Sequence, residues 1–169
     1  MEAEIKNITS DNIIKLKENK DILKLKIIDE NGNDTGEILT FNLEDIELPI
    51  KYQEIIESDK RARTHLKFRL EEIKRQPDKK GKKLLSANEE AQIKATQEFY
   101  KEEVKIYNMF LGENGVEKLL NGRELSWSTL EEIDEIIENA ILPKLKINAE
   151  NIKNKIMKKY SDKKDEIIE

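Results

Sequence analysis

The chain has 169 residues and a formal net charge of −5; charged residues make up 40% of it and hydrophobic residues 37%. This length fits one compact domain, and the high charge predicts a thin core with well-solvated helix faces. Because cysteine is absent, disulfides, thiolate zinc sites and a cysteine nucleophile are excluded.

The distribution of apolar residues along the chain indicates where in the cell the protein is found. The first 20 residues are polar with scattered isoleucines, which is not the pattern of a secretion signal. No apolar run approaches the roughly 20 residues that a membrane-spanning helix needs. We therefore expect a soluble, intracellular protein without a membrane partner.

The first predicted element is a β-hairpin within an N-terminal segment, residues 1–47. Apolar residues alternate with polar ones on both sides of Asn31-Gly32, a sequence typical of hairpin turns. The apolar positions are Leu23, Leu25, Ile27, Leu39, Phe41 and Leu43. The acidic stretch between them lacks the twelve-residue pattern of a calcium loop and is interpreted as a turn.

Two long helices are predicted next. The first begins near Leu48-Pro49 and ends near Gln76-Pro77, with an apolar stripe that Asp59 interrupts. A polar, basic loop follows at residues 77–83. The second helix, capped by Ser86 or Asn88, runs to about Leu111. The two stripes comprise Tyr52, Ile55, Ile56, Ala62, Leu66, Leu70 and Ile73, then Ala91, Ala95, Phe99, Ile106 and Phe110.

The C-terminal third is also predicted to be helical. A short helix at residues 116–121 precedes a capping-box pattern, Ser128 to Glu131. From there a helix carries Leu130, Ile133, Ile137, Ala140 and Ile141 on one face, and Pro143 is expected to end or kink it. The stripe continues through Leu145, Ala149, Ile152 and Ile156. The predicted fold is mainly α, a helical domain at residues 48–160 with a small N-terminal β-hairpin and a charged, frayed tail at 161–169.

No residues are predicted to be catalytic, metal-binding or cofactor-binding. His65 is the only histidine, and no orienting partner stands at a neighbouring spacing. The acidic residues from Glu131 to Glu138 fall on the polar face of a helix, and no phosphate-binding glycine loop is present. We therefore expect a non-enzymatic protein that needs no cofactor.

Two groups of residues could contact a partner. The basic residues Lys79 to Lys83 could touch a phosphate backbone, but no aromatic residues interleave with them and the whole chain is acidic. Nucleic acid is therefore disfavoured as a partner. Tyr107 and Trp127 are interpreted either as core residues or as interface anchors, since aromatic residues dominate such contacts.

The order of features resembles a known family. A hairpin around Asn31-Gly32 and two helices precede a block that runs from Tyr107 to Gly122, and an acidic helix then ends at Ile141-Leu142-Pro143. Over residues 22–145 this layout resembles the tail assembly chaperones of long-tailed bacteriophages and phage-tail-like particles. The residues that match the shared block are expected to be structural: Phe110, Leu111, Gly112, Gly115 and Leu119.

The resemblance implies a chaperone that binds the tape measure protein, keeps it soluble and recruits the tail tube protein in the host bacterial cytoplasm. It implies absence from the mature virion, and we expect a homo-oligomer. Three alternatives stay open: another phage structural, connector or adaptor protein, a nucleic-acid-binding regulator, and, last, a small enzyme.

Overall fold

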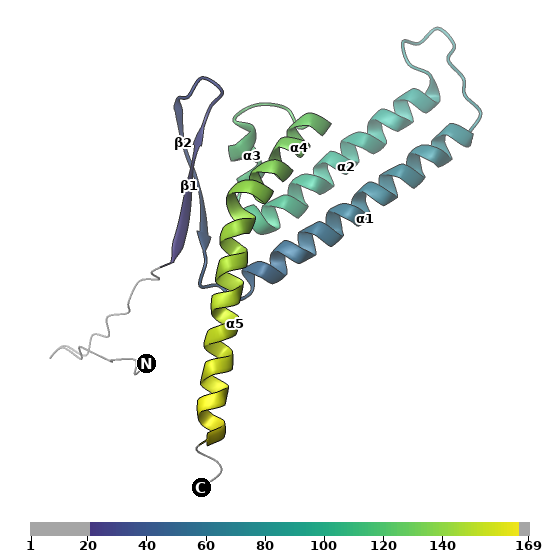
Figure 1. Cartoon of the computed structure of the whole chain (residues 1–169). Coiled ribbons are helices and arrows are strands. Elements are labelled where there is room, and N and C mark those ends of the chain that lie inside the picture. The colour runs from purple at the N-terminus through teal and green to yellow at the C-terminus, as the bar shows by residue number, and fades with distance from the viewer. Residues whose placement is uncertain (1–20, 166–169) are drawn as a thin grey trace, which may run out of the picture.

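The computed structural model describes residues 21–165, with side chains up to residue 159, and the predicted fold class is confirmed. A two-stranded antiparallel hairpin precedes a series of helices (Figure 1). The long pair α1 and α2 projects to one side of the molecule, and α5 projects to another. The predicted charged tail, residues 161–169, lies partly outside the described residues.

The hairpin joins β1, Ile22–Ile28, to β2, Asp34–Asn42, with Leu25 opposite Leu39. The acidic stretch between the strands forms a turn, as expected. There Asp29 Oδ1 accepts hydrogen bonds from the backbone N–H groups of Asn31, at 2.9 Å, and Asn33, at 2.8 Å. The predicted alternation is confirmed for β2 and the residue after it, because Leu39, Phe41 and Leu43 are all buried.

Helix α1, Leu48–Arg75, and helix α2, Ala87–Leu111, form an antiparallel pair. Proline lies in the first turn of α1, and Ser86 caps α2 through a reciprocal capping box with Glu89. Most of the predicted apolar stripe of each helix faces the other helix, although Ile56 is exposed. The basic loop lies at the tip of the pair, far from the hairpin (Figure 1).

Three helical segments complete the chain. Helix α3, Gly115–Leu120, and helix α4, Trp127–Ile136, are followed by the π-helical turn η1, Ile137–Ile141, and by α5, Leu142–Asp165. The capping box of α4 uses Ser126 and Thr129, so its predicted position at Ser128 was wrong by two residues.

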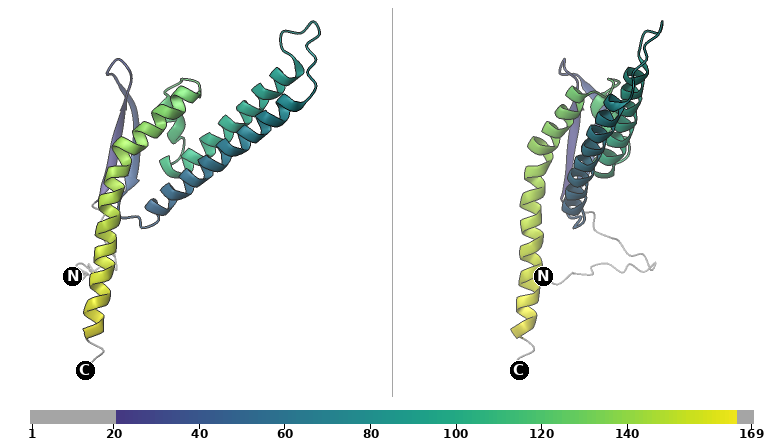
Figure 2. Two further views of the ribbon diagram at one scale, coloured as in Figure 1. Left: turned by 45° about the vertical axis from the view of Figure 1, so that its right-hand side comes forward. Right: turned by 90° about the vertical axis from the view of Figure 1, so that its right-hand side faces the viewer.

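Helix α4 and helix α5 are continuous through η1 but differ in direction (Figure 2). Pro143 has no backbone N–H to complete an α-helical bond, and π-turns and prolines are the usual sites of helix bends. The predicted kink is therefore present, although the helix does not end. The wider turn also changes which residues face inward: Ile137 and Ile141 are buried, whereas Ala140 is exposed and was wrongly predicted to face the core.

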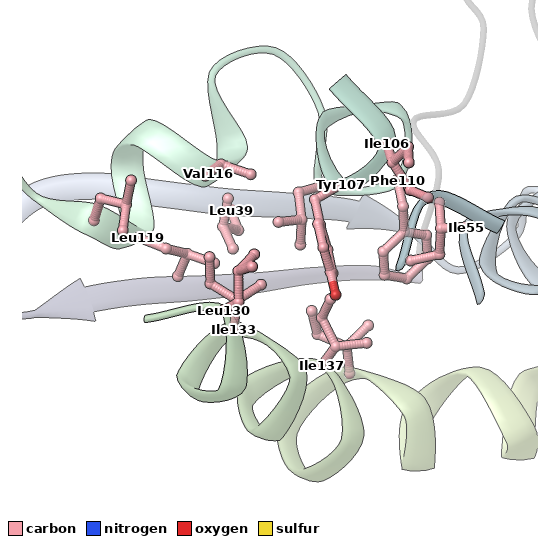
Figure 3. Packing of buried hydrophobic residues seen from close by; sticks show 14 of the residues in the cluster. Leu39, Ile55, Ile106, Tyr107, Phe110, Val116, Leu119, Leu130, Ile133 and Ile137 are labelled. Atoms are coloured by element: carbon pink, nitrogen blue, oxygen red, sulfur yellow. The ribbon is translucent and has the colours of Figure 1, made fainter. Parts of the chain in front are cut away.

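One hydrophobic core joins β2, the inner ends of α1 and α2, and the segment from α3 to η1. Figure 3 shows Leu39, Phe110 and Ile137 reaching into it from three different elements. The Phe110 ring lies 5.5 Å from that of Phe41 on β2 and 5.7 Å from that of Tyr52 on α1. Within residues 21–165, no helix has the length and apolar character of a bilayer span.

Phe110→Ala should lower the free energy of unfolding by about 3–5 kcal/mol, because it removes the ring that the hairpin and α1 share and leaves a cavity. Chemical denaturation followed by circular dichroism measures this change. Phe68→Ala is the matched control, since Phe68 on α1 is 63% exposed. Its expected effect is below about 0.5 kcal/mol, and equal effects at the two positions would contradict this description of the core.

Candidate functional site

A cluster of charged and phenolic side chains lies where α1, α2 and α4 meet. Helix α1 contributes Asp59 and Arg63, α2 contributes Glu103 and Tyr107, and α4 contributes Asp134. Each pair on α1 and α2 is four residues apart, which places its members on the same helix face. The cluster therefore joins one face of each long helix to α4.

Arg63 connects the acidic groups of this cluster. Its Nε donates to Asp59 Oδ1 at 2.6 Å, and its terminal nitrogen donates to Asp134 Oδ2 at 3.3 Å. The Tyr107 hydroxyl donates to the other oxygen of Asp134. The ring of Trp127 lies 5.6 Å from the guanidinium carbon, within the range of a cation–π contact. Arg63 is thus fixed by contacts with α1 and α4.

The surroundings shift the pKa of Tyr107, Arg63 and Asp134. Burial raises the pKa of Tyr107, and its hydrogen bond to Asp134 acts in the same direction, so the phenol stays neutral. Burial lowers the pKa of Arg63, but the hydrogen bond and charge of Asp59 outweigh this and raise it overall. Burial also raises the pKa of Asp134, and the charges of Asp59 and Glu138 act in the same direction, although its contacts with Tyr107 and Arg63 lower it.

Glu103 is the most enclosed member of the cluster, with no exposed surface. A carboxyl group in this position cannot contact a substrate in the surrounding solution. In the part of the chain that the structure describes, acidic and histidine side chains form no group suited to hold a metal ion. The contacts of the cluster instead attach α4 to the α1–α2 pair.

The residues of the resemblance block lie at the turn from α2 into α3. Phe110, Leu111 and Leu119 are buried in the core. Gly112 ends α2 with φ of 91°, a conformation that favours glycine. A Cβ on Gly115 would stand 2.4 Å from the Leu111 Cβ, so only glycine fits there. These residues are arranged for packing and chain reversal.

Tyr107 and Trp127, the candidate partner contacts, have different surroundings. Tyr107 is 3% exposed, which favours its interpretation as a core residue over that of an interface anchor: its ring packs in the core and its hydroxyl bonds to Asp134 (Figure 3). Trp127 is 44% exposed, and its inner side stacks on Phe99 at 5.3 Å. Trp127 therefore stays partly accessible.

An apolar groove lies between α5 and the start of α1. Two of its lining residues, Ile46 and Pro49, come from the β2–α1 connection and the first turn of α1. The others lie on one stripe of α5: Ala149, Ile152, Lys153, Ile156 and Met157. Ile156 is 46% exposed and Met157 64% exposed. This surface is called the α5 groove below.

Sequence reasoning missed the roles of Glu103 and Arg63. The stripe of α2 contains Phe99, Ile106 and Phe110, and Glu103 occupies the helical turn between the first two. Asp59 likewise interrupts the stripe of α1. Two acidic gaps in otherwise apolar stripes indicate a buried polar contact, but the sequence does not show that the two gaps face each other.

Arg63→Met should lower the free energy of unfolding by about 1–3 kcal/mol, because it leaves Asp59 and Asp134 close together without the cation between them. The estimate stays below that for a fully buried pair, since the Arg63 side chain is 33% exposed. Arg61→Met is the control: Arg61 is 72% exposed and faces Glu57 at 4.0 Å. Urea titration of both variants measures their free energies of unfolding. Equal values for Arg63→Met and Arg61→Met would contradict a stabilising role of the cluster.

Comparison of the sequence with protein-family models and with curated proteins finds no match, and comparison of the fold with solved structures finds none. The roles described above rest on the contacts, burial and charge of this chain's own residues. The features that remain as candidates for function are the buried charged cluster and the α5 groove.

Proposed function

We propose that the protein is a non-enzymatic tail assembly chaperone of a long-tailed bacteriophage or phage-tail-like particle, and that its α5 groove binds an amphipathic helix of the tape measure protein. The observation that carries the proposal is the uncovered apolar stripe on the projecting helix α5. Exposed apolar surfaces with polar borders are typical of protein interaction sites.

The shape of the α5 groove favours a segment of protein chain as its ligand. Its volume is about 280 Å³, at the lower limit of the roughly 300–1,000 Å³ of small-molecule pockets. The stripe residues follow the spacing of one helix face, and Ile46 and Pro49 form the opposite wall. An amphipathic helix laid in such a groove buries its own apolar residues at three- and four-residue intervals.

Charge favours an acidic helix over a basic one. From Lys144 to Lys159, α5 carries six lysines and one glutamate. On the opposite wall, Asp45 and Glu47 flank Ile46, but Lys51 lies 3.4 Å from Asp45 and 3.8 Å from Glu47 and offsets their charge. Among the described residues, Lys153 is the one charged residue that lines the α5 groove, and α5 as a whole is basic, so acidic positions on the client helix would complement it.

This mode of binding suits an assembly chaperone. A long helical client offers many similar apolar stripes, so several copies of the chaperone can bind along it with moderate affinity at each site. The charged outer faces of α1 and α2 would keep the complex soluble. Tail tube subunits would displace the chaperone as they assemble, so it would remain in the host cytoplasm and be absent from the virion.

Ile156→Asp should abolish or strongly reduce co-purification of the tape measure protein when both are expressed together, because a carboxylate in the α5 groove opposes burial of the client's apolar residues. Ile147→Asp is the matched control. Ile147 is 60% exposed on the same helix, but it lies nine residues away, which at about 100° per residue is the opposite face.

Pull-down and the soluble fraction of the client measure the effect. Wild-type levels of client with Ile156→Asp would contradict the assignment of the α5 groove, and equal losses with both variants would show that the groove face has no special role. A client that is soluble and unbound with or without the wild-type protein would contradict the chaperone function itself. Detection of the chain in purified mature particles would favour a connector or adaptor protein instead.

A further inference from the structure

Glu103 is a buried acid without a hydrogen-bond donor. Its side chain has no exposed surface, and neither carboxyl oxygen accepts a hydrogen bond from a donor among the described residues. Buried polar groups almost always have such a partner, because an unpaired group loses its hydration without compensation. The state of this carboxyl group therefore requires an explanation.

The donors around Glu103 are directed to other groups. Arg63 on α1 bonds to Asp59 and Asp134, and the Tyr107 hydroxyl on α2 bonds to Asp134 on α4. The one group within hydrogen-bonding reach of Glu103 that the contacts identify is the Asp59 carboxylate. Two ionised carboxylates cannot share a hydrogen bond, so a proton must lie on one of them.

We propose that Glu103 is protonated at neutral pH and donates this proton to Asp59, and that loss of the proton at alkaline pH weakens the attachment of α4, and with it α5, to the α1–α2 pair. This proposal rests on the buried cluster and is independent of the client-binding function.

The charges of the cluster explain why ionisation of Glu103 would loosen α4. With Glu103 protonated and Tyr107 neutral, the cluster holds one cation, Arg63, and two carboxylates, Asp59 and Asp134. Ionisation of Glu103 adds a third negative charge, at a position with no exposed surface. Asp134 is the acid that can move away, since its side chain is already 38% exposed and it is the only acid that α4 contributes to the cluster. Movement of Asp134 displaces α4 next to the bend at η1.

The direction of the pH effect follows from the same surroundings. Burial, together with the hydrogen bond and charge of Asp59, raises the pKa of Glu103 from its usual 4.5 to about 8, although the charge of Arg63 lowers it. Between these two pH values the unfolded chain has lost the proton and the folded chain retains it. Stability therefore falls as pH rises through this window and levels off above about pH 8.

Glu103→Gln tests the proposal, because the amide keeps the shape of the side chain and supplies a permanent donor to Asp59. The ratio of the unfolding constants of wild type and variant should rise roughly ten- to fifty-fold between pH 6 and pH 8. Glu102→Gln is the matched control, since Glu102 is the exposed neighbour on the same helix. For this variant, the ratio of the wild-type unfolding constant to that of the variant should stay nearly constant between pH 6 and pH 8. A constant ratio for Glu103→Gln would overturn the proposal.

Two measurements on the wild-type protein keep the test decisive if Glu103→Gln fails to fold. Infrared difference spectra between pH 7 and pH 9 should show loss of a protonated carboxylic acid band, and its absence at pH 7 would overturn the proposal. Amide hydrogen exchange, corrected for the intrinsic effect of pH, should increase in α4 and early α5 at pH 9 while central α2 stays protected. Unchanged protection of α4 would overturn the proposed loosening.

Discussion

The described elements depend on one small hydrophobic core, which lies where β2, the inner ends of α1 and α2, and the segment from α3 to η1 converge. Phe110 illustrates the constraint, since its ring is shared by the hairpin and α1 while its backbone belongs to α2. A two-stranded hairpin is marginal on its own. The hairpin, the short α3 and the bent α4–α5 helix therefore all draw their stability from the same set of contacts.

The charged cluster borders this core and gives the helices a specific arrangement. Apolar stripes alone allow neighbouring helices to slide by a turn, because one leucine or isoleucine replaces another at little loss. Asp59 and Glu103 lie next to each other only in the observed alignment of α1 with α2, and Asp134 has its two partners only when α4 occupies its observed place. The energetic penalty of an unpaired buried charge makes other alignments unfavourable.

The distribution of burial separates a stable centre from an accessible periphery. Leu145 is the last hydrophobic residue of α5 that is buried, and beyond it the stripe of α5 is partly or fully exposed. If α5 binds a helical client, as proposed, binding would complete the burial that the chain itself leaves unfinished. The bend at η1 lies between this surface and the charged cluster, so the position of α4 affects both.

The sequence by itself determined most of the secondary structure, because alternation, helical periodicity and turn residues are local signals. Asn31-Gly32, Ser86 and the stripe of α2 each predicted the element that forms. The α4 cap was placed two residues late, since Ser126 and Ser128 are both suitable caps and only the fold selects one. Ala140 was misplaced because a π-turn changes the period of the helix without a clear local signal.

Only the tertiary structure decided which residues of different elements meet. The acidic gaps at Asp59 and Glu103 are visible in the sequence, but periodicity assigns a residue to a helix face and does not identify the facing helix. The same limit applies to Tyr107, whose burial follows from the position of α4. It also applies to the α5 groove, since the stripe that ends in Ile156 has the same spacing as a core stripe and is accessible only because no element of the described chain covers it.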